Sequence, residues 1–245
     1  ESMSHMPVEE CGNMLLCVAA ICKIKNSAEY ANQHFNILKK WADYLVNVGW
    51  NPENQLCTDD FAGHLAHNCN LSIKGILAVA AFGYICGLLG QDGKSYIEKA
   101  KEFAAIWEKE AFDENCYRLA FDKENSWSLK YNLVWDRFFG FEIFSEKVAK
   151  TEVDFYKTKF NTYGVPLDSR EDYTKSDWQI WTACLTDDCD YLDMVIETMW
   201  KYVNETEDRI PFSDWYSTEG NEVSGSFRNR TVQGGLFMPL LFEKI

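Results

Sequence analysis

The chain has 245 residues, of which 47% are hydrophobic and 25% are charged, so it can bury a large core and is not a disordered segment. Its formal net charge of −14 is not offset by any basic cluster, which excludes a nucleic acid as its main partner.

The predicted elements are all helices, and hydrophobic periodicity divides them into two kinds. Inner helices are apolar on nearly every side and should be buried all round, whereas outer helices carry one apolar stripe and one charged face. In chain order, the inner helices cover residues 14–21, 71–89, 129–144, 178–185 and 231–242, and the outer helices cover residues 30–48, 97–108, 148–160 and 191–203. No alternating run of Val, Ile and Thr indicates a strand.

This alternation of inner and outer helices predicts the fold class. It is typical of an all-α toroid, the (α/α)6 architecture, in which antiparallel helix pairs form a buried inner ring and a solvated outer ring. A complete ring needs about three more helices, which would lie upstream. We therefore expect residues 1–245 to form a single helical toroid domain that is incomplete in this chain.

The connections from outer to inner helices are long and polar, which is typical of functional loops in compact domains. Because all inner helices point the same way, these loops are predicted to meet at one end. The N-termini of the inner helices lie there and favour carboxylates and polar ligands. The five loops cover residues 6–13, 56–70, 127–136, 166–178, and 211–216 together with 226–230.

Carboxylates are dense in all five loops. At close quarters they separate each other's pKa values, so that one can act as an acid and another as a base in glycoside or amide hydrolysis. Taken singly, each could instead be a helix N-cap or a surface charge. The candidates for catalysis are Glu9, Glu10, Asp60 and Asp177. The candidates for substrate binding are Asp59, His64, Trp127, Lys130, Asp136, Asp168, Arg170, Lys175, Asp214, Trp215 and Arg228.

Neither a metal nor an organic cofactor is predicted. His64 and His67 have the spacing of one helix face, but no third ligand accompanies them, so a structural role is favoured. The sequence has no Gly-x-Ser-x-Gly elbow, Ser-x-x-Lys box or Gly-rich phosphate loop. Its nine Cys form no C-x-x-C pair and favour free thiols over a disulfide scaffold.

The opening residues 1–7 lack the basic and apolar regions of a signal peptide, and no run of about 18 apolar residues is expected to span a bilayer. We therefore predict no membrane association. Free thiols favour a reducing cytoplasm or an anaerobe's cell envelope. Because the opening segment looks like the edge of a fragment, secretion stays open as an alternative.

Six motifs carry a family resemblance. They are Met6-Pro-Val-Glu-Glu-Cys-Gly-Asn-Met14, Leu56-Cys-Thr-Asp-Asp-Phe-Ala-Gly-His-Leu-Ala-His-Asn68, Lys130-Tyr-Asn-Leu-Val-Trp-Asp136, Pro166-Leu-Asp-Ser-Arg170, Tyr173-Thr-Lys-Ser-Asp-Trp178 and Pro211-Phe-Ser-Asp-Trp-Tyr216. In this order, over nearly the whole chain, they resemble the fungal and bacterial glutaminase A family. The resemblance implies an (α/α)6 toroid and a hydrolase of L-glutamine, and it corresponds to the C-terminal helical part of longer members. Cys11 and Cys69 depart from the family pattern, in which Ser and Ala are expected.

We therefore expect a hydrolase that cleaves the side-chain amide of L-glutamine or of a related small polar substrate. In this interpretation the candidate carboxylates activate water and protonate the leaving group, while Lys130, Arg170 and Lys175 hold the α-carboxylate. The alternative is a glycoside hydrolase on the same toroid that uses a carboxylate pair and Trp platforms. A second alternative is a non-catalytic binding or scaffold domain. The expected partners are an amino acid or sugar substrate and the upstream domains of the same polypeptide.

Overall fold

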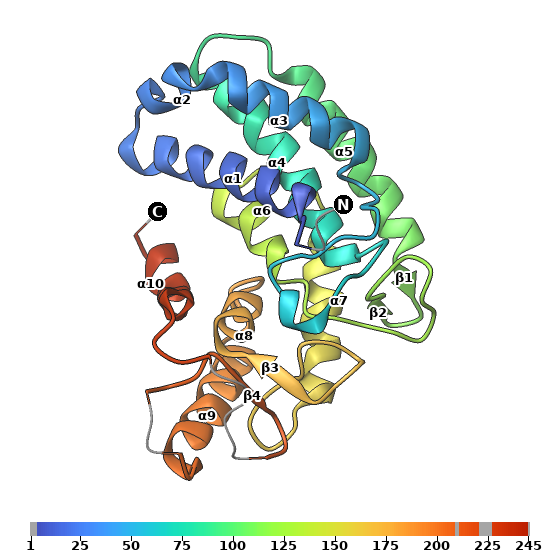
Figure 1. Cartoon of the computed structure of the whole chain (residues 1–245), viewed down its shortest axis with the longest axis vertical. Helices are drawn as coiled ribbons and strands as arrows, with labels where there is room; N and C mark the ends of the chain where they lie inside the picture. The colour runs from blue at the N-terminus through green and yellow to red at the C-terminus, as the bar shows by residue number, and fades with distance from the viewer. Residues whose placement is uncertain (1–3, 209–210, 221–226, 245) are drawn as a thin grey trace. The chain divides into compact units, whose positions relative to one another are not determined.

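A computed structural model describes residues 4–208, 211–220 and 227–244, so the first three residues and Ser226, named above in the opening and in the fifth loop, lie outside the described part. The chain divides into two compact units, each described by itself (Figure 1). Unit 1 comprises residues 1–112, 120–124 and 135–145, and unit 2 comprises residues 113–119, 125–134 and 146–245.

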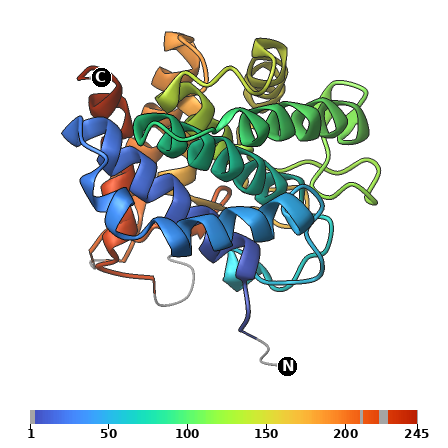
Figure 2. The same ribbon diagram turned by 90° about the horizontal axis from the view of Figure 1, so that it is seen from above.

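Unit 1 is helical. Its elements are α1 (Pro7–Lys25), α2 (Glu29–Gln33), α3 (Phe35–Val48), the 3-10 helix η1 (Asp60–Ala62), α4 (Cys69–Leu88), α5 (Lys94–Glu110) and all but the first residue of α6 (Val134–Phe139). Helix α4 contacts α1, α3 and α5, and Figure 2 shows it running between α3 and α5. Because α4 has neighbours on several sides, it is apolar nearly all round.

Helix α4 is the core of unit 1. Asn68 caps it, because its side-chain oxygen accepts hydrogen bonds from the backbone N–H groups of Asn70 and Leu71 at 2.9 and 3.1 Å. Gly75 lets the backbone of the neighbouring segment approach closely, since a Cβ there would lie 2.6 Å from the carbonyl oxygen of Gly49. Close backbone approach of this kind is a reason for glycine inside a helix, despite its low propensity.

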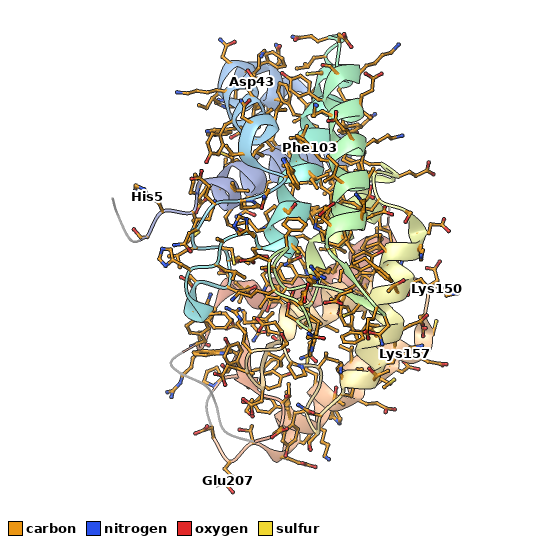
Figure 3. The ribbon with its side chains drawn as sticks, turned by 90° about the vertical axis from the view of Figure 1, so that its right-hand side faces the viewer. His5, Asp43, Phe103, Lys150, Lys157 and Glu207 are labelled. Atoms are coloured by element: carbon orange, nitrogen blue, oxygen red, sulfur yellow. The ribbon has the colours of Figure 1, made fainter. Side chains whose placement is uncertain are left out.

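Each of the two long helices beside α4 buries a single stripe. The buried residues are Leu38, Ala42 and Leu45 on α3, and Ala100, Phe103, Ala104 and Trp107 on α5. Phe103 points inward from α5 (Figure 3). The indole N–H of Trp107 donates to the carbonyl oxygen of Cys69 at 2.9 Å, which ties α5 to the start of α4.

The expectation that no apolar run is long enough to span a bilayer was wrong for helix α4. It is long and apolar enough to cross a membrane by length and composition, with a mean hydropathy of 1.8 over 18 residues. However, 83% of that stretch is buried inside the fold, as in the core helix of a globular unit. One such helix is weak evidence for a membrane span.

Unit 2 combines helices with short strands. Its elements are Asp113 of β1 (Phe112–Asp113), β2 (Cys116–Tyr117), η2 (Tyr131–Leu133), α7 (Glu146–Tyr156), η3 (Lys157–Lys159), β3 (Tyr173–Lys175), α8 (Ser176–Ala183), α9 (Cys189–Glu205), β4 (Trp215–Ser217), η4 (Thr231–Phe237) and α10 (Met238–Phe242). Helix α7 is an outer helix, and Lys150 on it is exposed and points outward (Figure 3).

The antiparallel pair β3–β4 positions the polar residues of unit 2. Its register places Thr174 opposite Tyr216 and Lys175 opposite Trp215. The ring of Tyr216 stacks on that of Tyr202 at 3.8 Å, which fixes β4 against α9. Strand β3 continues without a break into α8 (Figure 1).

The predicted all-α class is confirmed, but two inner helices are shorter than predicted. Residues 129–144 form only η2 and α6, because Gly140 adopts a left-handed φ of 67° and the carboxylate of Asp136 binds backbone N–H groups beyond it. Residues 231–242 form η4 followed by the short α10, and Gly234 and Gly235 explain the weak helix there.

One further expectation was wrong. Residues 6–13 are not a loop, because α1 begins at Pro7, whose fixed φ suits the first turn of a helix. Glu9 and Glu10 therefore lie in that first turn. Strands are also present, but each has only two or three residues, which is too short to leave an alternating pattern in the sequence.

Candidate active site

Three ionisable side chains are buried together in unit 2. They are Lys175 at the end of β3, Asp177 in the first turn of α8 and Asp214 just before β4. The ammonium nitrogen of Lys175 lies 3.1 Å from Oδ1 of Asp177 and forms an ion pair with Oδ2 of Asp214. The three side chains are 3%, 2% and 1% exposed, respectively. The backbone N–H of Ser176 donates to the carbonyl oxygen of Asp214 at 2.9 Å and fixes the two segments together.

The electrostatics of this cluster raise the pKa of Asp177. Burial raises the pKa of Asp177 above its ordinary value, and the negative charge of Asp214 raises it further. The ammonium of Lys175 lowers the same pKa without cancelling the rise. A carboxyl group with a raised pKa beside a second carboxylate is the arrangement that divides acid from base.

The hydrogen bonding of the two carboxylates is incomplete within the described residues. Oδ1 of Asp214 is buried and accepts no hydrogen bond there, and Oδ1 of Asp177 has its ion-pair contact with Lys175 but no well-aligned hydrogen bond. Buried polar atoms in folded proteins nearly always have a partner. Both oxygens therefore have spare capacity to accept hydrogen bonds from a ligand.

Asp168 and Arg170 bind each other in the fourth loop. The Nε and Nη2 atoms of Arg170 donate to the two carboxylate oxygens of Asp168 at 2.9 and 2.6 Å, and the backbone N–H of Arg170 donates at 2.9 Å. This is the bidentate geometry of a strong Arg–carboxylate pair. The guanidinium of Arg170 is thus engaged by the protein itself.

Lys130 is enclosed and does not face a substrate. Its side chain is 0% exposed, and its ammonium donates to the carbonyl oxygens of Tyr117 and Ser128, both at 2.9 Å. It also lies 3.6 Å from the buried carboxylate of Glu152. All of these partners belong to the core of unit 2 and none supports substrate binding by Lys130, which stays a prediction.

Asp136 in unit 1 also has a local role. Its carboxylate accepts the backbone N–H groups of Phe144 at 2.8 Å and Ile143 at 3.1 Å, which closes the turn after α6. Burial raises its pKa, and these hydrogen bonds act in the opposite direction. Its acceptor oxygens are therefore used by the turn.

A second buried ion pair lies in unit 1. Lys74 of α4 donates to Oε1 of Glu9, and it also donates to Oδ1 of Asn13 at 2.9 Å. The Asn13 amide donates to the same Glu9 oxygen at 3.1 Å. Glu10, the neighbouring candidate, is exposed.

The second loop places its candidates in different environments. Asp59 is buried, whereas Asp60 at the start of η1 and His64 just after it are exposed. His67 is not on a shared helix face with His64, and its Nδ1 lies 2.8 Å from Oδ1 of Asn51. No group of three metal-ligating side chains occurs among the described residues.

The remaining candidates of unit 2 are partly exposed. Trp127 is half-buried and packs edge-on against Phe155 at 5.6 Å. Trp215 is half-buried and contacts the ring of Phe227 at 5.0 Å. Arg228 is exposed on the segment that bridges to Ser213.

Sequence reasoning missed three charged residues. Lys74 left a signal, because it is the sole charge in the apolar run 71–89. Glu152 left none, since its helix carries several acids. Arg230 ends the fifth loop and lies 3.8 Å from Oδ2 of Asp214.

The structure brings together Lys175, Asp177 and Asp214, while convergence of all five loops stays a prediction.

These features define an all-α protein built from helical hairpins with a buried carboxylate pair. The family model of the glutaminase A six helical-hairpin domain matches residues 1–240, so the chain belongs to this family. It is similar to Glutaminase A of Aspergillus oryzae, with 37% identity over 244 residues that cover 96% of this chain and 35% of that protein. It is also similar to a protein named Probable glutaminase from Arthroderma benhamiae, with 29% identity over 249 residues, 88% of this chain and 29% of that protein.

The chain thus spans about a third of the length of these curated relatives. The family match confirms the predicted resemblance and the six-hairpin class. Both relatives are fungal, so these comparisons support the fungal side of the resemblance and not the bacterial one.

Proposed function

We propose that the chain is part of a glutaminase-type hydrolase and that Lys175, Asp177 and Asp214 form its catalytic cluster. One observation carries the proposal: two buried carboxylates share a single ammonium group, and each retains an oxygen without a hydrogen bond among the described residues. The names of the two relatives support an amide of the glutamine type as the substrate.

In the proposed reaction, water attacks the carbon of the substrate side-chain amide. Asp214 accepts a proton from that water, and the ammonium of Lys175 stabilises the negative charge that develops on the amide oxygen. Asp177 donates its proton to the nitrogen as the C–N bond breaks, which releases ammonia and leaves a carboxylic acid. The raised pKa of Asp177 suits the role of the acid.

The other predicted catalytic residues have weaker support. The carboxylate of Glu9 is already neutralised by Lys74 and hydrogen-bonded to Asn13. Glu10 and Asp60 are exposed, so burial does not tune them for catalysis. They stay predictions that the same assay can test, as do the single toroid domain and the upstream partner domains.

Sugar chemistry has less support than amide hydrolysis. A Trp platform needs a free ring face, but the face of Trp178 is covered by Tyr131, with the ring centroids 4.1 Å apart and the planes at 8°. The rings of Trp135 and Phe139 make a looser contact, with centroids 6.2 Å apart and planes at 28°. Turnover of an aryl glycoside without release of ammonia would nevertheless replace the amide proposal.

The test is release of ammonia from L-glutamine by the full-length polypeptide, beside a panel of aryl glycosides. Asp177→Asn and Asp214→Asn should each lower kcat by about 10²- to 10⁴-fold, the usual contribution of a general acid or base. Asp190→Asn, on the exposed first turn of α9, is the matched control and should retain activity. Unchanged kcat in both cluster variants would overturn the assignment, and no hydrolysis of any substrate would favour a binding or scaffold domain.

A further inference from the structure

We propose that Arg230 binds the carboxylate group of the substrate and is a residue that determines which amides the proposed site accepts. This inference rests on the proposed function and extends it, because it identifies a substrate-binding group that the sequence did not single out. It starts from the environment of one guanidinium group at the start of η4.

The guanidinium of Arg230 is held in place by a ring contact, and its N–H groups are still available to a ligand. Its central carbon lies 3.8 Å from the ring centroid of Phe227, and that ring in turn contacts Trp215 at 5.0 Å. The guanidinium donates no hydrogen bond within the described part of the chain, and 35% of the side chain is exposed. Stacking on an aromatic face fixes the guanidinium plane while leaving its N–H edge available.

Two other cations predicted in the loops of unit 2 lack this capacity. Lys175 lies between two carboxylates. Arg170 is bidentate to Asp168. Arg230 alone among these three keeps its five N–H donors, which match the two oxygens of a carboxylate.

Arg230 also lies at the right place for a small substrate. Its Nη1 is 3.8 Å from Oδ2 of Asp214, and the same oxygen forms the ion pair with Lys175. Oδ1 of Asp214 is buried without a hydrogen bond among the described residues, so it can receive one from a ligand between these groups. A small substrate whose carboxylate binds Arg230 would therefore place its amide beside Asp214.

This arrangement specifies a chemical class. The substrate carries an anionic carboxylate a few carbon atoms from the scissile amide, as glutamine does. A neutral sugar offers no group for Arg230, and an amide without a carboxylate would leave the guanidinium unpaired. Discrimination should therefore appear in substrate binding.

The test compares L-glutamine with 4-aminobutanamide, which is glutamine without its α-carboxylate, on the full-length polypeptide. The wild type should prefer glutamine by about 10- to 100-fold in kcat/KM, as expected for hydrogen bonds between charged groups. Arg230→Gln should raise KM for glutamine by a similar factor, with little change for 4-aminobutanamide. Arg230→Lys keeps the charge but loses the fork and should fall between the two. Lys159→Gln removes another cation that lies over a phenylalanine ring, Phe155, and should behave like the wild type.

A second measurement does not depend on turnover. Calorimetric binding of L-glutamate to the wild type should weaken about 10-fold or more in Arg230→Gln and stay unchanged in Lys159→Gln. Equal kcat/KM for the two amides in the wild type, or equal glutamate affinity in wild type and Arg230→Gln, would overturn the role of Arg230. If the wild type released no ammonia from L-glutamine, the proposed function on which this role rests would be contradicted instead.

Discussion

The ammonium nitrogen of Lys175 lies 3.1 Å from Oδ1 of Asp177, yet the pKa of Asp177 is raised. Desolvation is the largest cause of the rise, and the charge of Asp214 adds to it. In a buried cluster with two acids and one base, the attraction of a single ammonium group does not offset desolvation and the second negative charge in the pKa of Asp177. This relationship predicts effects on stability as well as on the proposed catalysis.

The first prediction concerns the pH dependence of stability. A carboxyl group whose pKa is higher in the folded than in the unfolded state stabilises the protein fully below the unfolded pKa and loses that contribution as pH rises through the folded pKa. The unfolding free energy of the wild type should therefore decline above the ordinary range of an Asp, by about 1.4 kcal/mol for each pH unit that separates the folded from the unfolded pKa. Asp177→Asn should lack this part of the decline in urea titrations from acid to neutral pH.

Asp136 and Glu152 also have raised pKa values caused mainly by burial, so only the difference between wild type and variant reports on Asp177. Asp190→Asn serves as the control, since this residue is exposed. Identical pH profiles for wild type and Asp177→Asn would mean that Asp177 is ionised in the folded protein, which would also remove it as the acid.

The second prediction concerns the buried pair Lys130–Glu152. Both side chains are 0% exposed, and Glu152 also accepts the backbone N–H of Tyr117 at 2.8 Å. Removing one partner leaves a buried charge uncompensated, so Lys130→Met or Glu152→Gln should each lower the unfolding free energy by about 3–5 kcal/mol. The double variant Lys130→Met/Glu152→Gln should lose less than the sum of the two.

Chemical denaturation of the four proteins in this cycle measures the coupling. The exposed pair Lys99–Glu102 is the comparison, and Glu102→Gln there should cost no more than about 1 kcal/mol. Additive losses at Lys130 and Glu152 would show that the pair is not coupled.

Helix α4 supports a third prediction, with a control inside the same helix. A Cβ at Gly75 would lie 2.6 Å from the carbonyl oxygen of Gly49, whereas a Cβ at Gly87 would have no neighbour within 4 Å among those considered. Gly75→Ala should therefore lower the unfolding free energy by about 1–3 kcal/mol through overpacking. Gly87→Ala should be neutral or stabilising by about 0.5–1 kcal/mol, because alanine is the better helix former. Equal thermal shifts would contradict the close approach at Gly75.

Much of the helical fold could be predicted, because burial leaves a periodic pattern. The apolar run 71–89 became α4, and the stripe at residues 97–108 became α5. The failures lie where local chemistry overrides the pattern. Residues 129–144 are apolar, but Gly140 and the side chain of Asp136 end the helix early, and periodicity does not report either effect.

The sequence predicted which residues form the candidate site more reliably than it predicted the contacts that each residue makes. Asp177, Lys175 and Asp214 were all chosen from carboxylate-rich loops, and the structure places them in one cluster. Lys130 was chosen for the same reason but is enclosed by its near neighbour Ser128 and by Tyr117 and Glu152, which lie on the separate elements β2 and α7. Which cation is free depends on such tertiary contacts, and no spacing rule reveals them.

The last prediction links packing to catalysis through the glycine pair of η4. A Cβ at Gly235 would lie 2.9 Å from the Cβ of Asp177 and 3.1 Å from Nε1 of Trp181. Gly235→Ala must therefore displace Asp177 or shift η4, and misplacement of a catalytic group by about 1 Å can cost 10²-fold in rate. We expect kcat for ammonia release to fall by about 10- to 100-fold. At Gly234 a Cβ would have no such neighbour within 4 Å, so Gly234→Ala should retain the wild-type kcat. If the two alanine variants were equally active and equally stable, Asp177 would not depend on this contact, and its position in the proposed cluster would have to be fixed by Lys175 and α8 alone.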